Sequence, residues 1–193
     1  DLVDIAALRR LFRVYTDRLG VIYGAAARAD FLAAIAAMLG VLIFDTLPGL
    51  VIGIGLSLLL LLYRSSRPNV ATLGQHNGMW VDVSRQPSAT SPPGIAVLRV
   101  ESGLYFANAD HVRDVIKSSA HGDVRTVILD GETMPFIDVS AAEALTSLGT
   151  SLQRDGVELW LARDIGQVRD VLRSTSSVRV FATIDEAVRA ASG

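Results

Sequence analysis

The stretch from Phe31 to Pro68 reads FLAAIAAMLGVLIFDTLPGLVIGIGLSLLLLLYRSSRP. Its first 33 residues contain a single charged side chain, that of Asp45. As one straight helix this run would be about 50 Å long, whereas the hydrocarbon core of a membrane is about 30 Å thick. The Pro-Gly pair shortly after Asp45 is a turn signal that ends helices. The stretch therefore predicts a membrane hairpin of two short transmembrane helices, at about 31–44 and 48–63.

Small residues in this hairpin are of the kind that let transmembrane helices approach each other closely, namely Gly40, Gly53, Gly55 and Ser57. A buried helix pair of a soluble protein is the alternative, which the almost wholly apolar run 56–63 disfavours. Arginines precede and follow the hairpin, but its tip has no basic residue. Because positively charged segments tend to stay in the cytoplasm, both ends of the hairpin are expected on the cytoplasmic side.

Residues 1–29 are expected to form an amphipathic segment at the membrane interface. Apolar residues recur there at steps of three and four, at Leu2, Ile5, Leu8, Leu11, Phe12, Tyr15 and Leu19. Arg9, Arg10 and Arg13 lie mostly off this stripe, as in a helix that rests on a membrane surface. A helix that packs into a protein core would show the same stripe, so both interpretations stay open.

The charge of the chain changes after the hairpin. Residues 1–78 contain seven arginines and five acidic residues, whereas residues 79–193 contain eleven basic and fifteen acidic residues. The acidic second part disfavours nucleic acid as a partner. With residues 30–64 read as the hairpin and 65–78 as a linker, residues 79–193 are expected to form a cytoplasmic domain. The chain begins at Asp1 without an initiator methionine or a signal pattern, which suggests the C-terminal piece of a longer protein.

In the second part, apolar runs alternate with segments of helical period, which predicts an α/β domain with a mixed, mainly parallel sheet covered by helices. Strands are expected at 79–84, 95–101, 104–107, 125–130, 157–162 and 178–182, and helices at 109–120, 140–154, 165–173 and 185–191. We expect the helices on one side of the sheet, over a core with Val127, Leu129, Leu145, Leu148, Leu152, Leu159 and Leu161. Helix starts are marked by Asn108 and by two capping-box patterns, Ser140–Glu143 and Thr183–Glu186.

Several kinds of site are missing from the sequence. There is no cysteine, which excludes disulfides and cysteine-based zinc sites. The histidines, His76, His111 and His121, do not have the spacing of metal ligands. Neither a Gly-rich phosphate loop nor the Ser-His-Asp order of a hydrolase is found. No enzyme, metal or cofactor is therefore expected.

Motifs in order along the chain resemble the SulP family of anion transporters, the sulfate permeases, which end in a STAS domain. In the first part they are residues 4–14, 30–32, 39–41, 48–50, 56–59, 63–68 and 71–74. In the second part they are Leu104-Tyr105-Phe106-Ala107-Asn108-Ala109 and Ile137-Asp138-Val139-Ser140, which resemble the hallmarks of STAS domains. Two features depart from the pattern: residues 15–29 are longer than the family's link, and Ala141 stands where anti-sigma-factor antagonists usually have glycine.

The resemblance implies the C-terminal part of a secondary active transporter for inorganic anions such as sulfate or bicarbonate, coupled to protons or sodium or working by exchange. In that fold the anion lies between half-helix N-termini near the membrane midplane. The substrate site is therefore expected upstream of Asp1. The resemblance also implies a multi-pass protein of the cell membrane, in contact with lipid, with a regulatory cytoplasmic STAS domain, and a homodimer.

Ser140 and Asp138 are the regulatory candidates, because Ser140 aligns with the serine that anti-sigma-factor antagonists present for phosphorylation. A phosphate there would add nearly two negative charges at the start of a helix. The alternative is that Ser140 is only the N-cap of that helix, worth about 1 kcal/mol. Asp130 and Asp138 flank a loop that suggests a nucleotide or metal pocket, although carboxylates at strand ends are more often solvated. A membrane-tethered signalling module of the anti-sigma-factor-antagonist type and a nucleotide-sensing STAS module stay open as functions.

Overall fold

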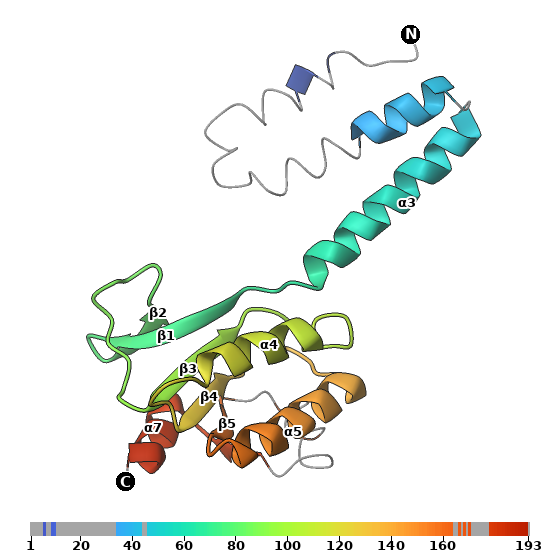
Figure 1. Ribbon diagram of the computed structural model, residues 1–193. Helices are drawn as coiled ribbons and strands as arrows, with labels where there is room; N and C mark the ends of the chain where they lie inside the picture. Colours follow the sequence, from blue (N-terminus) through green and yellow to red (C-terminus); the bar gives the residue numbers. More distant parts are fainter. Residues whose placement is uncertain are drawn as a thin grey trace. The chain divides into compact units, whose positions relative to one another are not determined.

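The structure of the protein, a computed structural model, describes residues 6, 9, 10, 34–43, 46–163, 166, 168, 170 and 178–192. The chain divides into two compact units, Asp1–Arg64 and Ser65–Gly193 (Figure 1). Of the predicted interfacial segment 1–29, the structure describes three residues, which are helical. The prediction for that segment therefore lies outside the described part of the chain.

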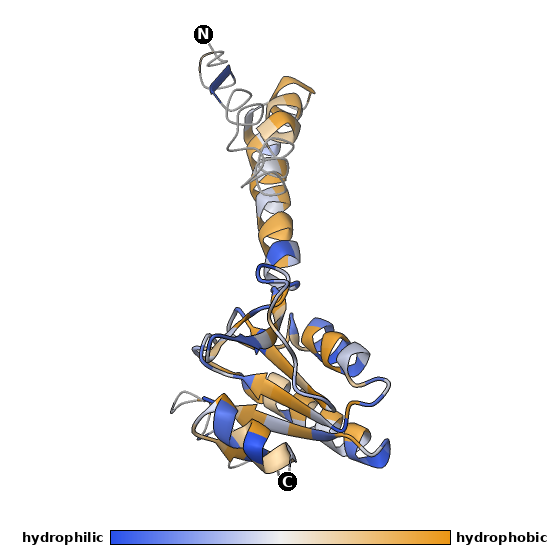
Figure 2. Ribbon diagram, turned by 90° about the vertical axis from the view of Figure 1, so that its left-hand side faces the viewer, coloured by the Kyte–Doolittle hydropathy of each residue, from blue (hydrophilic) through white to orange (hydrophobic). Residues whose placement is uncertain are grey.

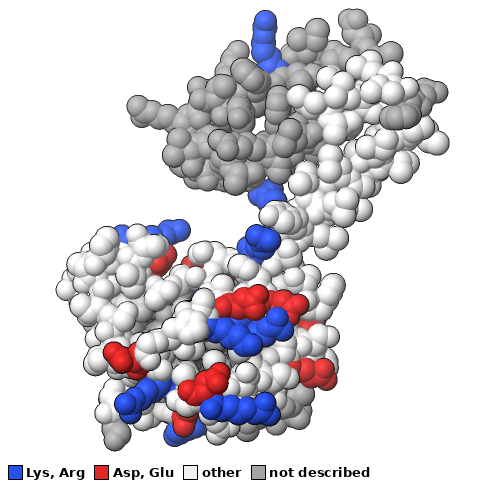
Figure 3. All heavy atoms as spheres, viewed as in Figure 1, with Lys and Arg blue, Asp and Glu red and all other residues white. Residues whose placement is uncertain are grey.

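The first unit contains an apolar helix, Ala34–Ile43, and the longer helix α3, Thr46–Ser65. With 20 residues α3 is about 30 Å long, and among the described residues it is the one helix long and apolar enough to cross a membrane. Figures 2 and 3 show it as apolar along most of its length and uncharged except at its end. The expected helix at 48–63 is thus too short by two residues at each end. Pro48 fits inside α3 because the first turn of a helix needs no N–H from that position.

The two apolar helices pack closely at two glycines of α3 that are buried, Gly49 and Gly53. A Cβ atom at Gly49 would lie 2.3 Å from the backbone nitrogen of Val41. A Cβ atom at Gly53 would lie 2.8 Å from the Cβ of Ala37. The glycines stand four residues apart, on one face of α3, so the helix backbones approach each other along this face.

The contact agrees only in part with the small residues expected from the sequence. Gly40 belongs to it, since a Cβ there would lie 3.1 Å from the Cα of Gly49. Gly55 does not belong to it, because a Cβ at that position would meet nothing within 4 Å. Ser57 is exposed. Gly49, expected in a turn because of the Pro-Gly pair, lies instead inside α3, and it makes the tightest approach because it is opposite a backbone atom of Val41.

The second unit is built on a six-stranded sheet with the order β2-β1-β3-β4-β5-β6. The strands are β1 Val70–His76, β2 Met79–Asp82, β3 Ile95–Val100, β4 Thr126–Asp130, β5 Glu158–Ala162 and β6 Arg179–Phe181. The helices are α4 Ala109–Ser119, α5 Val139–Arg154 and α7 Ile184–Ser192. β1 runs antiparallel to both neighbours, and β3 to β6 are parallel. This confirms the mixed, mainly parallel sheet.

β1 occupies part of the stretch 65–78 that the sequence analysis read as a linker, and it joins β2 through a tight turn at Asn77 and Gly78. Both turn residues have positive φ, 50° and 78°, as a two-residue hairpin turn requires. The expected strand 104–107 is reduced to one bridging residue, Leu104. In the expected helix 165–173, the three described residues are helical.

Helices cover both faces of the sheet, which corrects the expectation of a one-sided cover (Figures 1 and 2). On one face α4 and α5 pack on alternate strand residues such as Leu98 and Val127. On the other face α7 packs on Ile128 and Trp160 through Ile184. The second cover is needed because β4 is buried along its whole length, so neither of its faces is left to solvent. All seven predicted core residues are buried on the first face.

Candidate functional site

The two segments with the sequence hallmarks meet at the ends of neighbouring parallel strands. One lies between β3 and α4, and the other lies between β4 and α5. Leu104 N donates to Phe136 O at 3.0 Å, and Asp138 N donates to Leu104 O at 3.0 Å. These bonds form a parallel bridge between Leu104 and Ile137. The fold therefore joins the two loops into one candidate site, although they are about thirty residues apart in sequence.

Asp138 connects both loops through its carboxylate. Its Oδ1 accepts from Ala141 N at 2.7 Å, which makes Asp138 the N-cap of α5. Its Oδ2 accepts from Phe106 N at 2.9 Å, in the other loop. We call this pair of hydrogen bonds the Asp138 clamp. A single carboxylate thus holds the start of α5 and the backbone ahead of α4.

The position of Asp138 overturns the interpretation of Ser140 as the N-cap. α5 begins at Val139, so Ser140 lies within its first turn, where its side chain points outward and is exposed. Among the described residues no hydrogen bond to the Ser140 hydroxyl is found. The capping-box pattern misled because Asp138 and Ser140 are both good capping residues, and the helix starts after the first of them. The second expected cap is confirmed, since Thr183 Oγ1 accepts from Glu186 N at 3.1 Å.

Asn108 shapes the other loop. It directly precedes α4, as expected, but its side chain makes no capping bond to that helix. Instead, Oδ1 accepts from Tyr105 N and Nδ2 donates to Gly103 O, both at 2.9 Å. Because Asn108 is fully buried, these bonds satisfy an amide that could not reach solvent. Asn108 therefore fixes the backbone that presents Tyr105 and Phe106.

An apolar surface, formed by the exposed residues Phe106, Phe136 and Val139 and the half-buried Tyr105, surrounds this junction. Phe106 is 71% exposed and Val139 is 63% exposed. The ring of Tyr105 lies 5.8 Å from that of Phe106 and 6.1 Å from that of Phe136, between centroids. The backbone of Gly103 lies under Phe136, because a Cβ there would be 2.3 Å from its ring. This surface was not predicted from the sequence, although the two aromatic residues in the first motif, Tyr105 and Phe106, and Phe136 directly before the second were a signal for it.

Asp130 and Asp138 do not form the nucleotide or metal pocket that their sequence positions suggest. Asp130 is fully buried, which also contradicts the expectation of a solvated carboxylate. Its Oδ2 accepts from Arg99 Nε at 2.7 Å and from Arg163 Nη2 at 2.6 Å. Asp138 has different partners, in the clamp. Within the described part of the chain, no group of three or more His, Cys, Asp or Glu side chains could hold a metal ion.

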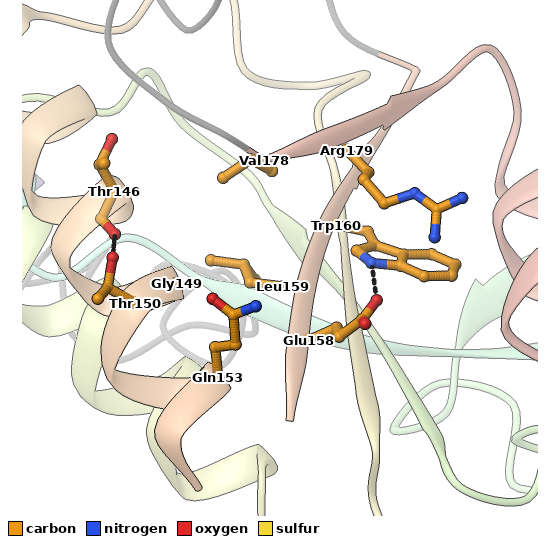
Figure 4. Close-up of a pocket in the computed structure, with 9 residues that line it drawn as sticks. All are labelled: Thr146, Gly149, Thr150, Gln153, Glu158, Leu159, Trp160, Val178 and Arg179. Atoms are coloured by element: carbon orange, nitrogen blue, oxygen red, sulfur yellow. Dashed lines mark hydrogen bonds between the residues drawn. The ribbon is translucent and has the colours of Figure 1, made fainter. Parts of the chain in front are cut away.

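A cavity of about 190 Å³ lies elsewhere, between α5, β5 and β6 (Figure 4). The polar side chains in its wall are Thr146, Thr150, Gln153, Glu158 and Arg179. At one end Trp160 Nε1 donates to Glu158 Oε2 at 2.7 Å, and the Arg179 guanidinium lies 4.6 Å from the centroid of the Trp160 ring. None of the candidate site residues from the sequence lines this cavity, although the predicted core residue Leu159 does.

Comparison with known proteins assigns the class. Residues 86–191 match the STAS domain, so the chain belongs to the STAS-domain family. Low affinity sulfate transporter 3 of Stylosanthes hamata is 35% identical over 182 residues, which cover 83% of this chain and 28% of that protein. A probable sulfate transporter of Mycobacterium tuberculosis (strain H37Rv) is 31% identical over 200 residues, covering 98% of this chain and 34% of that protein.

A solved structure shows the same fold over nearly the whole chain. Murine solute carrier 26 family member A9, an anion transporter in the inward-facing state, superposes with a TM-score of 0.70 at 24% identity. The superposition covers 99% of this chain and 30% of that one. These matches agree with the resemblance to SulP transporters that the ordered motifs indicated. The chain spans about a third or less of the length of these proteins.

Proposed function

We propose that the chain forms the last membrane helices and the regulatory STAS domain of a secondary active transporter for inorganic anions such as sulfate or bicarbonate. One observation carries the proposal: the mycobacterial relative that matches 98% of this chain, apolar helices included, is named a probable sulfate transporter. The apolar helix α3, long enough to cross a membrane, supports it. The proposal assigns transport rather than catalysis, with the anion bound by residues outside this chain.

Uptake by the full-length protein that contains this chain tests the proposal. Proteoliposomes should take up labelled sulfate with time, and excess unlabelled sulfate or bicarbonate should reduce the uptake. Imposed proton or sodium gradients should identify the coupling ion, and a lack of response to either would indicate exchange. Empty liposomes provide the background. Failure to transport any small inorganic anion above that background would contradict the proposal.

The location of the second unit in the cytoplasm belongs to the same proposal. Arg64 and Arg67 follow the apolar part of α3, and no basic residue lies in its first turn. This asymmetry favours the cytoplasmic side for the end of α3, where lipid headgroups would meet the arginines.

A homodimer is also part of the proposal, and chemical cross-linking of the full-length protein in membranes would show a doubled mass.

For Ser140 and Asp138 we propose a regulatory role at the joined loops. Ser140 is exposed in the first turn of α5, where a phosphate would meet the positive end of the helix dipole. The exposed hydroxyl also favours the second candidate function, a membrane-tethered signalling module whose output depends on that phosphate.

Anion flux by full-length Ser140→Asp and Ser140→Ala proteins, compared at equal membrane abundance, tests this role. If the charge at this position regulates transport, Ser140→Asp should change the flux while Ser140→Ala should leave it near wild type. Equal flux for both variants and wild type would contradict a charge-dependent switch. A signalling module would instead show charge-dependent partner binding in a protein that transports no anion.

A further inference from the structure

Four charged side chains, Arg99, Asp130, Glu132 and Arg163, form an ion cluster at the ends of three neighbouring parallel strands. Arg99 of β3 lies in register with Asp130, the last residue of β4. Asp130 in turn lies in register with Ala162, the last residue of β5, and Arg163 follows it. The sheet therefore brings one arginine to each side of the Asp130 carboxylate.

Asp130 is the inner member and fixes both guanidinium groups. Arg163 binds it with two nitrogens, Nε to Oδ1 at 3.0 Å and Nη2 to Oδ2 at 2.6 Å. Arg99 Nε reaches Oδ2 at 2.7 Å. Since Asp130 is fully buried and accepts from both arginines, its charge is neutralised within the protein. The remaining guanidinium nitrogens are thereby held in fixed directions.

Two of these outer nitrogens converge on one oxygen of Glu132. Arg163 Nη1 lies 2.9 Å from Glu132 Oε2, and Arg99 Nη2 lies 3.6 Å from the same atom. The Glu132 side chain is 52% exposed, in contrast to Asp130. An exposed ion pair of a flexible side chain contributes little to stability. The Glu132 side chain can therefore turn away from the two guanidinium groups while Asp130 keeps them in place.

The backbone at Arg163 has a conformation that arginine seldom adopts. Its φ is +54°, a left-handed conformation that side chains other than glycine, asparagine and aspartate seldom adopt. A residue with glycine's freedom would be favoured here if only a turn were needed. Arginine in this position directs its guanidinium across the end of β5 to Asp130 and Glu132.

We propose that Arg99 and Arg163 form a binding site for a tetrahedral oxyanion, free sulfate or phosphate, in which the Glu132 carboxylate occupies the place of the anion. Carboxylate, sulfate and phosphate oxygens accept the same guanidinium N–H groups, and arginine is the side chain best suited to them. Of the two arginines, Arg99 also acts on Asp82: the pKa of Asp82 is lowered mainly by hydrogen bonds from Ser84, and the charges of Arg85 and Arg99 add to this. The site lies in the STAS domain and does not depend on the transport proposal.

Calorimetric titration of sodium sulfate into the purified whole chain in detergent micelles, at constant ionic strength, tests the site. Glu132→Gln should bind sulfate about tenfold more tightly than the wild type, because the competing carboxylate charge is gone and the arginines remain. Adding Arg99→Gln should remove that gain. Parallel titrations with inorganic phosphate identify the preferred oxyanion, and sodium chloride serves as the spherical-anion control.

Glu101→Gln is the matched control. Glu101 lies two residues after Arg99, accepts from Asn69 Nδ2 at 2.8 Å, and loses the same charge on substitution. Its affinity for sulfate should stay within about twofold of the wild type, since an exposed charge acts weakly through salt solution. If Glu132→Gln gained no more than this control, or gained equally for chloride, the proposal would be overturned.

A second measurement needs no change at Glu132. Sulfate should raise the Tm of the wild-type chain more than chloride does at the same ionic strength, because a ligand of the folded state stabilises it. The additional increase should disappear in Arg99→Gln, which keeps the paired nitrogens of Arg163 on Asp130. An equal rise of Tm in both proteins would overturn the proposal.

Discussion

Replacement of Asp138 by alanine should destabilise the second unit because it removes both bonds of the clamp. The bond from Ala141 N, at 2.7 Å, caps α5, and loss of such a cap costs about 1 kcal/mol. The bond from Phe106 N, at 2.9 Å, has a charged acceptor, which would be worth about 1.5–3 kcal/mol in a buried site. Because Phe106 is exposed, water can replace part of this hydrogen bond once it is lost, and we expect its net contribution to stability to be about 1 kcal/mol. We expect a total loss of about 2 kcal/mol in the free energy of unfolding.

Two further variants separate the contributions. Asp138→Asn keeps one side-chain oxygen and therefore one of the two bonds, so its loss should be about 1 kcal/mol. Ser140→Ala removes an exposed hydroxyl and should change the free energy of unfolding by less than about 0.5 kcal/mol. Asp138→Ala should therefore be the most destabilising variant, Asp138→Asn should be intermediate, and Ser140→Ala should be the least destabilising.

Urea denaturation of the whole chain in detergent, followed by tryptophan fluorescence, measures these differences. Both tryptophans of the chain, Trp80 and Trp160, belong to the second unit, so the signal reports its unfolding and not that of the membrane helices. Trp160 is buried and should show a large change. If Ser140→Ala cost as much as Asp138→Ala, the assignment of the cap to Asp138 would be refuted.

Three other outcomes follow from the packing and the charge pattern. Gly49→Ala should separate the two apolar helices and lower the cross-linking yield between cysteines placed on them, while Gly55→Ala, which adds its methyl group in open space, should leave that yield unchanged. Leu148→Ala should lower the free energy of unfolding by about 2–5 kcal/mol in the same fluorescence assay, because Leu148 is 1% exposed in the core. Cysteines at Thr46 and Ser102 should be labelled from opposite sides of the membrane, and labelling from one side would contradict the proposed hairpin topology.

The sequence predicted the sheet well where its signals were independent of tertiary contacts. The apolar runs that became β3, β4 and β5 are buried by packing on both faces, and their hydrophobicity alone marked them. β1 was missed because it contains Gly74 and follows a polar segment, so its composition resembled a linker. The Asn77-Gly78 pair was the overlooked signal, since this dipeptide favours a hairpin turn and thereby implies a strand on either side.

The candidate site was predictable as a location but not in its chemistry. The two motifs identified the loops that Leu104 and Ile137 join. Asp138 and Ser140 are both suitable caps for α5, and only the hydrogen-bond geometry decides between them. Asp138 is the cap, and its carboxylate also accepts a hydrogen bond from Phe106 N. The burial of Asp130 could not be inferred either, because its two arginines are distant in sequence: Arg99 of β3 lies 31 residues before it, and Arg163, directly after β5, lies 33 residues after it.

The clamp gives a physical route by which a charge at Ser140 could affect the exposed apolar surface. The backbone N–H of Ala141, which Asp138 holds, belongs to the same helix start that would attract a phosphate on Ser140. A phosphate and the Asp138 carboxylate repel each other and compete for those N–H groups. Displacement of the carboxylate would also release Phe106 N, and with it one restraint on the loop that carries Tyr105 and Phe106. A phosphate on Ser140 would therefore act on the exposed apolar surface through the Asp138 carboxylate.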